Sequence, residues 1–410
     1  MTSEFRTDSL EIIRHITLKE RRRGGIFFTP KKIRTALIQR IVETGLNVRT
    51  VLEPSMGSGE FIRDISSEYP GVDITGIEIN RTIYDKQSHA LPATRTHCCD
   101  FLEFKASYSF DLIIGNPPYF QIKPADKGKY KSIYPELGGK FDIYIIFILK
   151  SLRLLSPNTG ILAFVLPKTF INTQSYENVR RLISGGGEYT IIDVMDFKEH
   201  DSTWCGTKQS TIGLIVQRRQ SSALCRFVFE AGPLLSVVNS SDTVDALHTL
   251  THGYHTLCEL GYTVKTGEII WTSAEYRPLM TDEGELPSTK LLIHNSQIHD
   301  NTYVPKKPRG SSRPLYIQTC DKFVITDPFI AVNRGNGNGG NLRFQCALIE
   351  PAEYAYPLVA ENHIYKISGP SIRELYASLC DPRTLEFIQH TVGNGILTKT
   401  LIGYIPFFYK

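Results

Sequence analysis

The sequence predicts an α/β protein whose first part is a doubly wound, mostly parallel sheet of seven strands and whose second part is an irregular α/β domain. Short apolar, β-branched runs alternate with amphipathic helical stretches as far as about residue 217. This alternation is typical of βαβ units. Beyond about residue 222 it fades, and turn-forming stretches become frequent. We therefore expect an amino-terminal extension at 1–23, a first domain at 24–222 and a second domain at 223–410.

The predicted elements follow one another in the order that such a sheet requires. Ile33, Leu37 and Ile41 recur at helical spacing after Thr29-Pro30, which predicts a helix over 31–43. Another amphipathic helix is expected at 142–155. Ligands of such sheets bind beyond the carboxyl ends of the strands, so the residues that follow each strand are candidates for a functional site. The predicted strands are seven short apolar runs, at 48–54, 73–79, 96–100, 110–116, 160–167, 189–195 and 209–217.

The 410-residue chain has the composition of an ordinary globular protein, with 41% hydrophobic and 21% charged residues. Its net charge is +4, and the first 220 residues hold 30 lysines and arginines against 24 acidic residues. The eight cysteines include no CxxC pair, which argues against a zinc site or a disulfide framework. The amino terminus lacks a signal-peptide pattern, and the longest apolar run, at 143–149, is too short to cross a bilayer. We expect a soluble cytoplasmic protein with no metal and no membrane partner.

Three consecutive strands end in residues that suit a nucleoside cofactor. The first strand leads into the turn Glu53-Pro54-Ser55-Met56-Gly57-Ser58-Gly59, whose glycines let the backbone pass close beneath a ligand. Glu78 follows the second strand, 19 residues past Gly59, where a carboxylate can accept both hydroxyls of a ribose. After the third strand, Asp100 can accept from an adenine amino group and Phe101 can cover its ring. Each position alone is common in plain turns, but three in register predict a cofactor site.

The fourth strand ends in Asn116-Pro117-Pro118-Tyr119, which carries the strongest chemical signal in the chain. The Asn116 side-chain oxygen and the Pro117 carbonyl can accept both N–H bonds of an amino group whose lone pair is delocalised into a base. These contacts draw the nitrogen towards tetrahedral geometry and free its lone pair for attack on a methyl sulfonium. Tyr119 can stack on an extruded base. The alternative is a Pro-Pro turn with Tyr119 as packing, which leaves the cofactor positions unexplained.

With these motifs, residues 24–217 resemble the gamma-class DNA adenine-N6 methyltransferases, in particular the TaqI-like enzymes. The resemblance implies a Rossmann-like methyltransferase fold with S-adenosylmethionine as cofactor, and it assigns catalysis to Asn116, Pro117, Pro118 and Tyr119. The family uses a second stacking aromatic after the sixth strand, for which we favour Trp204 over Phe197. The turn sequence SMGSG and the extension before Gly24 depart from the family pattern. The implied cofactor-binding residues are Phe28, Thr29, Pro30, Glu53, Pro54, Gly57, Gly59, Glu78, Asp100 and Phe101.

Two basic segments suit contacts with nucleic acid. The first follows the catalytic tetrapeptide and interleaves lysines with tyrosines over residues 121–140, and the second, over residues 301–320, contains no acidic residue. Arg334 is a third candidate, because it begins the Gly-Asn tract at 334–341, which could enter a groove of the DNA. A solvated surface is the competing interpretation of all three. The candidate DNA contacts are Lys123, Lys127, Lys129, Lys306, Lys307, Arg309, Arg313 and Arg334.

We therefore expect a site-specific enzyme that transfers a methyl group to N6 of an adenine flipped out of double-stranded DNA, with residues 223–410 as the DNA target-recognition domain. It would act as a monomer, and a cognate restriction endonuclease could act separately. The same tetrapeptide occurs in methyltransferases of RNA adenine and of protein glutamine amides, so these are alternative substrates. About 190 residues behind the catalytic domain favour DNA. A non-catalytic specificity protein that retains the cofactor fold is a further alternative, which the intact tetrapeptide opposes.

Overall fold

The computed structural model divides into two compact units, unit 1 (Met1–Phe229 and Leu235–Val244) and unit 2 (Glu230–Leu234 and Asp245–Lys410). Among the described helices, none is long and apolar enough to cross a membrane. The assignment of an extension, a catalytic domain and a DNA-recognition domain stays a prediction. The structure describes residues 4–91, 94–139, 141–197, 210–219, 225–231, 234–282, 284, 288–307, 313–319, 321–335, 344–392 and 397–409.

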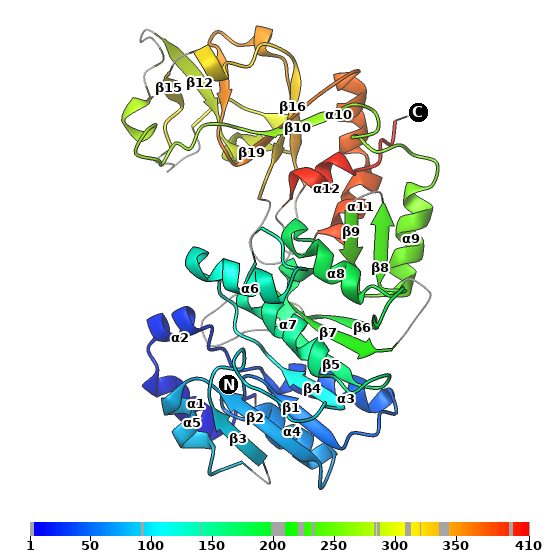
Figure 1. Ribbon diagram of the computed structural model, residues 1–410. Helices are drawn as coiled ribbons and strands as arrows, with labels where there is room; N and C mark the ends of the chain where they lie inside the picture. Colours follow the sequence, from blue (N-terminus) through cyan, green and yellow to red (C-terminus); the bar gives the residue numbers. More distant parts are fainter. Residues whose placement is uncertain are drawn as a thin grey trace. The chain divides into compact units, whose positions relative to one another are not determined.

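Unit 1 contains the predicted seven-stranded sheet, with its strands in the order β3-β2-β1-β4-β5-β7-β6 (Figure 1). The five neighbours from β3 to β5 run parallel, whereas β7 runs antiparallel to both β5 and β6. The prediction of a doubly wound, mostly parallel sheet is therefore confirmed. Its strands are β1 (Thr50–Glu53), β2 (Asp73–Glu78), β3 (Thr94–Cys98), β4 (Leu112–Gly115), β5 (Ile161–Pro167), β6 (Tyr189–Phe197) and β7 (Thr211–Arg218).

Helices cover both faces of this sheet. Leu112 and Ile114 of β4 belong to the core beneath α3 and α4, while Ile113 between them belongs to the core beneath α7 and α8. Because both faces are covered, the strand is apolar at every position. The helices of unit 1 beyond the amino-terminal pair are α3 (Lys31–Glu43), α4 (Glu60–Glu68), α5 (Arg81–Gln87), α6 (Lys127–Ile133), α7 (Ile143–Leu154) and α8 (Glu177–Ile183).

Unit 1 begins with two helices, α1 (Thr7–His15) and α2 (Leu18–Gly24). Ile12 and Ile16 form a small apolar core with Ile83 of α5. The Ser9 hydroxyl donates a hydrogen bond of 2.5 Å to Oε1 of Glu60, the first residue of α4. Helix α1 is therefore packed against the sheet domain through both apolar and polar contacts.

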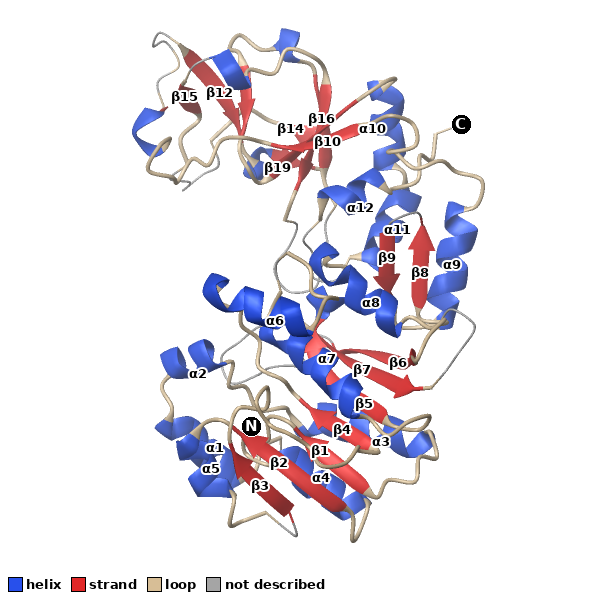
Figure 2. Cartoon of the chain, in the orientation of Figure 1, coloured by secondary structure: helices blue, strands red, loops and turns tan. Residues whose placement is uncertain are grey.

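Unit 2 is built mainly on two four-stranded sheets, one of which contains β10, β16 and β19 and the other β12 and β15 (Figure 2). The strand orders are β10-β19-β16-β17 and β11-β15-β12-β18. Strands β12 and β18 run parallel, and apolar side chains of both sheets share one core. The strands are β10 (Thr263–Thr266), β11 (Met280–Thr281), β12 (Thr289–Ile293), β13 (Ile298–His299), β14 (Thr302–Tyr303), β15 (Tyr316–Gln318), β16 (Phe329–Asn333), β17 (Cys346–Ile349), β18 (Leu358–Ala360) and β19 (Ile364–Ser368).

Three helices follow these strands, and a hairpin and a helix precede them. The short strands between helices agree with the irregular α/β character expected of the second half. The helices that follow are α10 (Ile372–Cys380), α11 (Pro382–Thr391) and α12 (Lys399–Gly403); the preceding elements are β8 (Val228–Ala231), β9 (Leu234–Val237) and α9 (Ser241–Thr251).

Candidate active site

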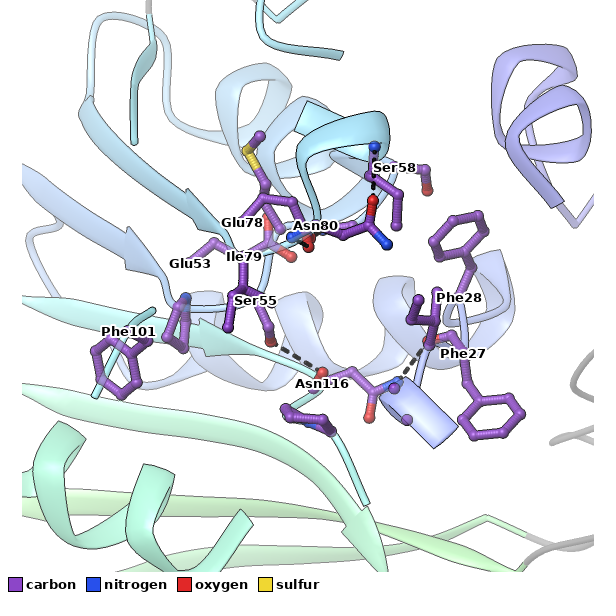
Figure 3. A pocket seen from close by; sticks show the side chains of 18 of the residues that line it. Phe27, Phe28, Glu53, Ser55, Ser58, Glu78, Ile79, Asn80, Phe101 and Asn116 are labelled. Atoms are coloured by element: carbon purple, nitrogen blue, oxygen red, sulfur yellow. Dashed lines mark hydrogen bonds between the residues drawn. The ribbon is translucent and has the colours of Figure 1, made fainter. Parts of the chain in front are cut away.

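A pocket of about 390 Å³ lies in unit 1 where strands β1 to β4 end (Figure 3). Its walls are the turns that follow these four strands, the segment 24–29 and part of α7. Parallel strands present their carboxyl ends at one edge of a sheet, which is where ligands of doubly wound sheets bind. The fold thus brings the four strand-end motifs of the sequence to one cavity.

Glu78 ties the first two of these turns together. Its Oε2 accepts a hydrogen bond of 3.0 Å from the Gly57 backbone N–H, and its Oε1 accepts one of 2.7 Å from the Asn80 backbone N–H. Burial raises the pKa of Glu78, and the backbone hydrogen bonds oppose this rise. Gly57 itself has φ of 50°, and a Cβ atom there would lie 3.1 Å from the Phe28 ring. The turn is therefore held close to the pocket wall at a position that favours glycine.

Glu53 is a buried carboxylate in the wall of the same pocket. Its Oε2 atom makes no hydrogen bond within the part of the chain that the structure describes. Burial raises the pKa of Glu53 well above its ordinary value, and the positive charge of Arg34 opposes the rise. A buried oxygen without a donor is costly, so this atom is suited to a cationic or N–H group of a ligand.

A lysine fixes the backbone of the turn that follows β3. Lys150 of α7 donates hydrogen bonds to the carbonyl oxygens of Phe101 (2.6 Å), Leu102 (2.9 Å) and Phe104 (2.7 Å). Asp100 accepts a hydrogen bond of 2.8 Å from the Leu102 backbone N–H. These contacts fix the backbone that carries Asp100 and Phe101 into the pocket wall.

Asn116 directly follows β4, and its side-chain amide is held in one orientation. Its Nδ2 donates a hydrogen bond of 2.9 Å to the Phe27 carbonyl oxygen (Figure 3). The Tyr119 hydroxyl lies 2.5 Å from Asn116 Oδ1 and 2.7 Å from the Val165 carbonyl oxygen, so its single proton is shared between two acceptors. The Ser55 hydroxyl donates to the Asn116 backbone carbonyl over 3.0 Å. Because the Phe27 carbonyl can only accept a hydrogen bond, the amide nitrogen of Asn116 faces Phe27, and the Oδ1 atom of Asn116 faces the opposite way.

Gly25 sets the distance between the amino-terminal segment and the tetrapeptide. It has φ of 64°, and a Cβ atom there would lie 2.8 Å from both the Tyr119 backbone nitrogen and Pro118 Cβ. We expect Gly25→Ala to displace the tetrapeptide and to lower kcat by about tenfold to a hundredfold, because small displacements of reacting groups are costly. The measurement is steady-state methyl transfer.

Gly45→Ala is the matched control for this prediction. Gly45 has φ of 69°, so alanine suffers the same backbone strain there, but nothing lies within 4 Å of the added Cβ. If both variants lower kcat equally, the contact of Gly25 with the tetrapeptide has no part in catalysis.

Most of the residues predicted for the site meet in this pocket. Pro30, Gly59, Pro117 and Tyr119 lie beside it in sequence but are not among its lining residues, and Trp204 lies outside the described residues. Phe197 ends β6 and packs in the core beneath α3, and the choice between Phe197 and Trp204 stays a prediction. The predicted residues that line the pocket are Phe28, Thr29, Glu53, Pro54, Gly57, Glu78, Asp100, Phe101, Asn116 and Pro118.

Sequence reasoning missed several residues of the site. Asn80 carried a usable signal, because its side chain caps α5 directly after β2. Phe27 acts through its own backbone carbonyl, which accepts from the Asn116 side chain, and Lys150 acts through hydrogen bonds to distant carbonyls. No local pattern marks such roles. Arg34 was assigned to an amphipathic helix, yet its side chain is buried and lines the pocket.

The predicted DNA contacts are spread over both units. In unit 1, Lys123 and Lys129 are exposed, and Lys129 lies 3.8 Å from Glu103. Lys127 donates to the Gly139 carbonyl over 3.3 Å. In unit 2, Lys306 and Arg334 are exposed, Lys307 pairs with Asp282, and Arg313 is partly buried. Arg309 lies outside the described residues.

Known proteins resemble this chain in sequence. A model of the Eco57I restriction-modification methylase family matches residues 63–202. The modification methylase CviBIII of Paramecium bursaria Chlorella virus NC1A is 28% identical over 405 residues, 96% of each chain. The Type II methyltransferase M.CvrRI of Paramecium bursaria Chlorella virus XZ-6E is 25% identical over 98% of this chain and 99% of that protein. The Type II methyltransferase M.AccI of Acinetobacter calcoaceticus is 31% identical over 45% of this chain and 35% of that protein.

The solved structure of a class I S-adenosylmethionine-dependent methyltransferase from Listeria monocytogenes aligns with 52% of this chain and with 66% of its own length, at 18% identity and a TM-score of 0.40. The strand order of unit 1 and the sequence relatives agree on a Rossmann-like methyltransferase fold with S-adenosylmethionine as cofactor.

The pocket fits this cofactor. S-adenosylmethionine carries an ammonium group, a sulfonium, two ribose hydroxyls and an adenine. The Oε2 atom of Glu53, which has no hydrogen-bond donor among the described residues, suits the ammonium group, and Glu78 offers a second buried carboxylate for hydroxyl groups. Asp100 and Phe101 lie on the wall of the same cavity, where an adenine ring needs an acceptor and an apolar surface.

Proposed function

We propose that this chain is a Type II DNA methyltransferase that transfers a methyl group from S-adenosylmethionine to the N6 amino group of an adenine flipped out of double-stranded DNA. The observation that carries the proposal is Asn116, which stands in the wall of the cofactor pocket with its amide orientation held by Phe27. The names of the full-length relatives, a modification methylase and a Type II methyltransferase, support DNA as the substrate.

Different residues around the pocket would bind different parts of the cofactor. S-adenosylmethionine supplies, when bound, a methyl group on a positively charged sulfur, which is the electrophile. Glu53 would hold the ammonium end, Glu78 the ribose hydroxyls, and Asp100 with Phe101 the adenine. Phe28 and Thr29, from the segment before α3, complete the wall.

Asn116 and Pro117 prepare the target nitrogen. The Asn116 Oδ1 atom and the Pro117 carbonyl oxygen accept the two N–H bonds of the adenine amino group, which withdraws its lone pair from the ring. The oxygen of Asn116 has two lone pairs, so it can accept from Tyr119 and from the amine together. The methylated nitrogen then loses a proton to solvent, and no side chain with a special pKa is required.

Tyr119 is proposed to hold the flipped base. Its side chain is partly exposed, but its hydroxyl is buried, which raises the pKa of Tyr119 well above the ordinary value. The Tyr119 ring meets the Tyr144 ring edge-on, with centroids 5.9 Å apart. These contacts orient the ring beside Asn116. A second aromatic, for which Trp204 remains our choice over Phe197, would cover the other face of the base.

Unit 2 is proposed to recognise the DNA sequence, with Lys306, Lys307, Arg309, Arg313 and Arg334 as candidate contacts. Lysines after the tetrapeptide would meet the DNA backbone from unit 1. We propose that the enzyme acts as a monomer, since it modifies one strand at a time, and that a separate restriction endonuclease could share its recognition sequence.

The proposal is tested by the transfer of labelled methyl groups to unmethylated duplex DNA, to RNA and to protein, followed by nucleoside and amino-acid analysis. We expect N6-methyladenine in duplex DNA. Label in cytosine or only in RNA or in glutamine would refute the proposed substrate, while the absence of transfer to any acceptor would refute catalysis altogether.

Glu78→Gln tests the assignment of the cofactor. We expect the dissociation constant of S-adenosylmethionine to rise about tenfold to a hundredfold, because hydrogen bonds to a charged group contribute about 1.5–3 kcal/mol. Isothermal titration calorimetry measures it, with Glu68→Gln at the exposed end of α4 as control. Unchanged affinity in Glu78→Gln would remove Glu78 from the cofactor site.

A further inference from the structure

A buried carboxylate stands at the edge of a sheet in unit 2, with two histidines and an arginine close to it. Glu361 directly follows β18, and its side chain is 0% exposed. Strand β12 runs parallel to β18, so the residues after both strands meet at this edge. The Asn295 backbone N–H, just after β12, donates to Glu361 Oε1 over 2.9 Å.

Two histidines flank this carboxylate. The Nδ1 atoms of His294 and His363 lie 3.5 Å and 3.3 Å from Glu361 Oε2. His294 is buried and its Nε2 lies 2.8 Å from the Pro314 carbonyl oxygen, whereas the side chain of His363 is 51% exposed. Burial acts to raise the pKa of Glu361, but the nearby His294 ring, the hydrogen bond from the Asn295 backbone and the contact with His363 lower it below the ordinary value. The carboxylate therefore stays ionised and attracts cations.

Arg313 is held against this carboxylate by three different contacts. Its Nη1 atom donates a hydrogen bond of 2.5 Å to Asn295 Oδ1 and lies 3.7 Å from Glu361 Oε1. Its guanidinium carbon lies 5.8 Å from the centroid of the Trp271 ring. Despite these contacts its side chain remains 32% exposed. A guanidinium fixed by a carboxylate, an amide and an aromatic ring has lost most of its freedom before any ligand arrives.

A second arginine lies next to the first group. The Arg334 backbone N–H donates to the His363 carbonyl over 2.9 Å, and the Arg334 guanidinium carbon lies 5.9 Å from the Tyr365 ring centroid. Arg313 and Arg334 thus form a cationic surface that is at least partly exposed, in which Glu361 anchors Arg313 and the Tyr365 ring lies beside Arg334. A polyanion is the ligand that this surface fits.

We infer that Arg313 reads a guanine in the recognition sequence through the O6 and N7 edge of that base, with Glu361, Asn295 and Trp271 as its positioning residues. This rests on the proposed function. Arginine to guanine O6 and N7 is the commonest specific contact between protein and DNA, and it requires a planar fork held in a fixed plane. A phosphate contact needs only a mobile charge, which Lys306 or Arg334 can supply. The cost of burying Glu361 favours a role that demands orientation.

The experiment combines variants of the protein with a changed base. Sites methylated by the wild type are first found by sequencing of modified adenines, and each guanine of the site is then replaced by 7-deazaguanine, which lacks the N7 acceptor. We expect one guanine at which this change lowers wild-type kcat/KM about 10- to 100-fold. In Arg313→Gln the same base change should have little further effect, and methylation should spread to sites that differ at that position.

Two more variants separate orientation from folding. Arg313→Lys keeps the positive charge beside Glu361 but lacks the planar guanidinium fork. It should therefore lose the preference for guanine, as Arg313→Gln does, while its thermal midpoint stays near that of the wild type. Arg373→Gln, an exposed arginine of α10 that pairs with Glu350, should leave the recognised sequence unchanged.

Several results would overturn the inference. A uniform loss of affinity at all sites, with a weaker dependence on salt, would make Arg313 a phosphate contact. A recognition sequence without guanine, or unaltered specificity in Arg313→Gln and Arg313→Lys, would also exclude it while the proposed function stands. If the wild type modified no DNA at all, the proposed function would fail first.

Discussion

Asn116→Ala is expected to lower methyl transfer about a hundredfold to a thousandfold, the loss typical when one preorganised polar partner of a transition state is removed. The variant keeps the Pro117 carbonyl but loses the Oδ1 acceptor, so only one N–H bond of the target amine is held. The Tyr119 hydroxyl retains the Val165 carbonyl as acceptor, and the tetrapeptide backbone stays anchored by Ser55. Single-turnover methylation of duplex DNA with saturating cofactor measures the effect on the chemical step.

The controls distinguish lost chemistry from a disturbed fold. The affinity of Asn116→Ala for S-adenosylmethionine should stay within about twofold of the wild type, because no cofactor contact is assigned to this side chain. Asn47→Ala, at an exposed position before β1, should leave both activity and affinity unchanged. Activity near the wild-type level in Asn116→Ala would contradict the mechanism.

Arg34→Ala is expected to destabilise unit 1 by about 3–5 kcal/mol, because it leaves the buried carboxylate of Glu60 with only the exposed Arg6, 3.8 Å away, as a cationic partner. The Arg34 side chain is 3% exposed and lies 3.0 Å from Glu60 Oε2 and 2.6 Å from Asp64 Oδ2. It also donates to the Thr29 carbonyl over 2.5 Å, which ties α3 to the pocket wall. The measurement is urea denaturation followed by circular dichroism.

The comparison variant is Arg81→Ala, which removes an exposed ion pair with Asp85. Exposed pairs one helical turn apart contribute about 0.3–0.5 kcal/mol, so this variant should unfold almost as the wild type does. Equal and small losses of stability in both variants would show that the contacts of Arg34 contribute no more to the free energy of unfolding than an exposed ion pair does.

The predicted unit 1 sheet and the composition of its pocket followed from local patterns. A strand buried on both faces must be apolar throughout, as β4 is, and a parallel sheet gathers the ends of its strands at one edge. Glu53, Glu78, Asp100 and Asn116 therefore meet in space although they lie in four separate turns.

Other parts of the site depend on contacts that have no period in the sequence. The hydrogen bond from Asn116 to Phe27 joins residues 89 positions apart, and Gly25 meets the tetrapeptide through its missing side chain. Neither contact can be predicted from the sequence around the residues that make it. The Tyr119 hydroxyl was expected only as part of a stacking ring, and its buried hydrogen bonds appear only when β5 is placed beside the turn.

The sequence by itself determined the fold class of unit 1, the order of its strands along the chain and the residues at their ends, because hydrophobic periodicity and turn chemistry are local properties. Only the tertiary structure decided which of the scattered charges act together. Arg313 looked like one more basic residue in a surface segment, and Glu361 carried no signal at all. Arg313 and Glu361 meet because β12 and β18, which are far apart in the sequence, pair in parallel. That pairing depends on the packing of the whole unit.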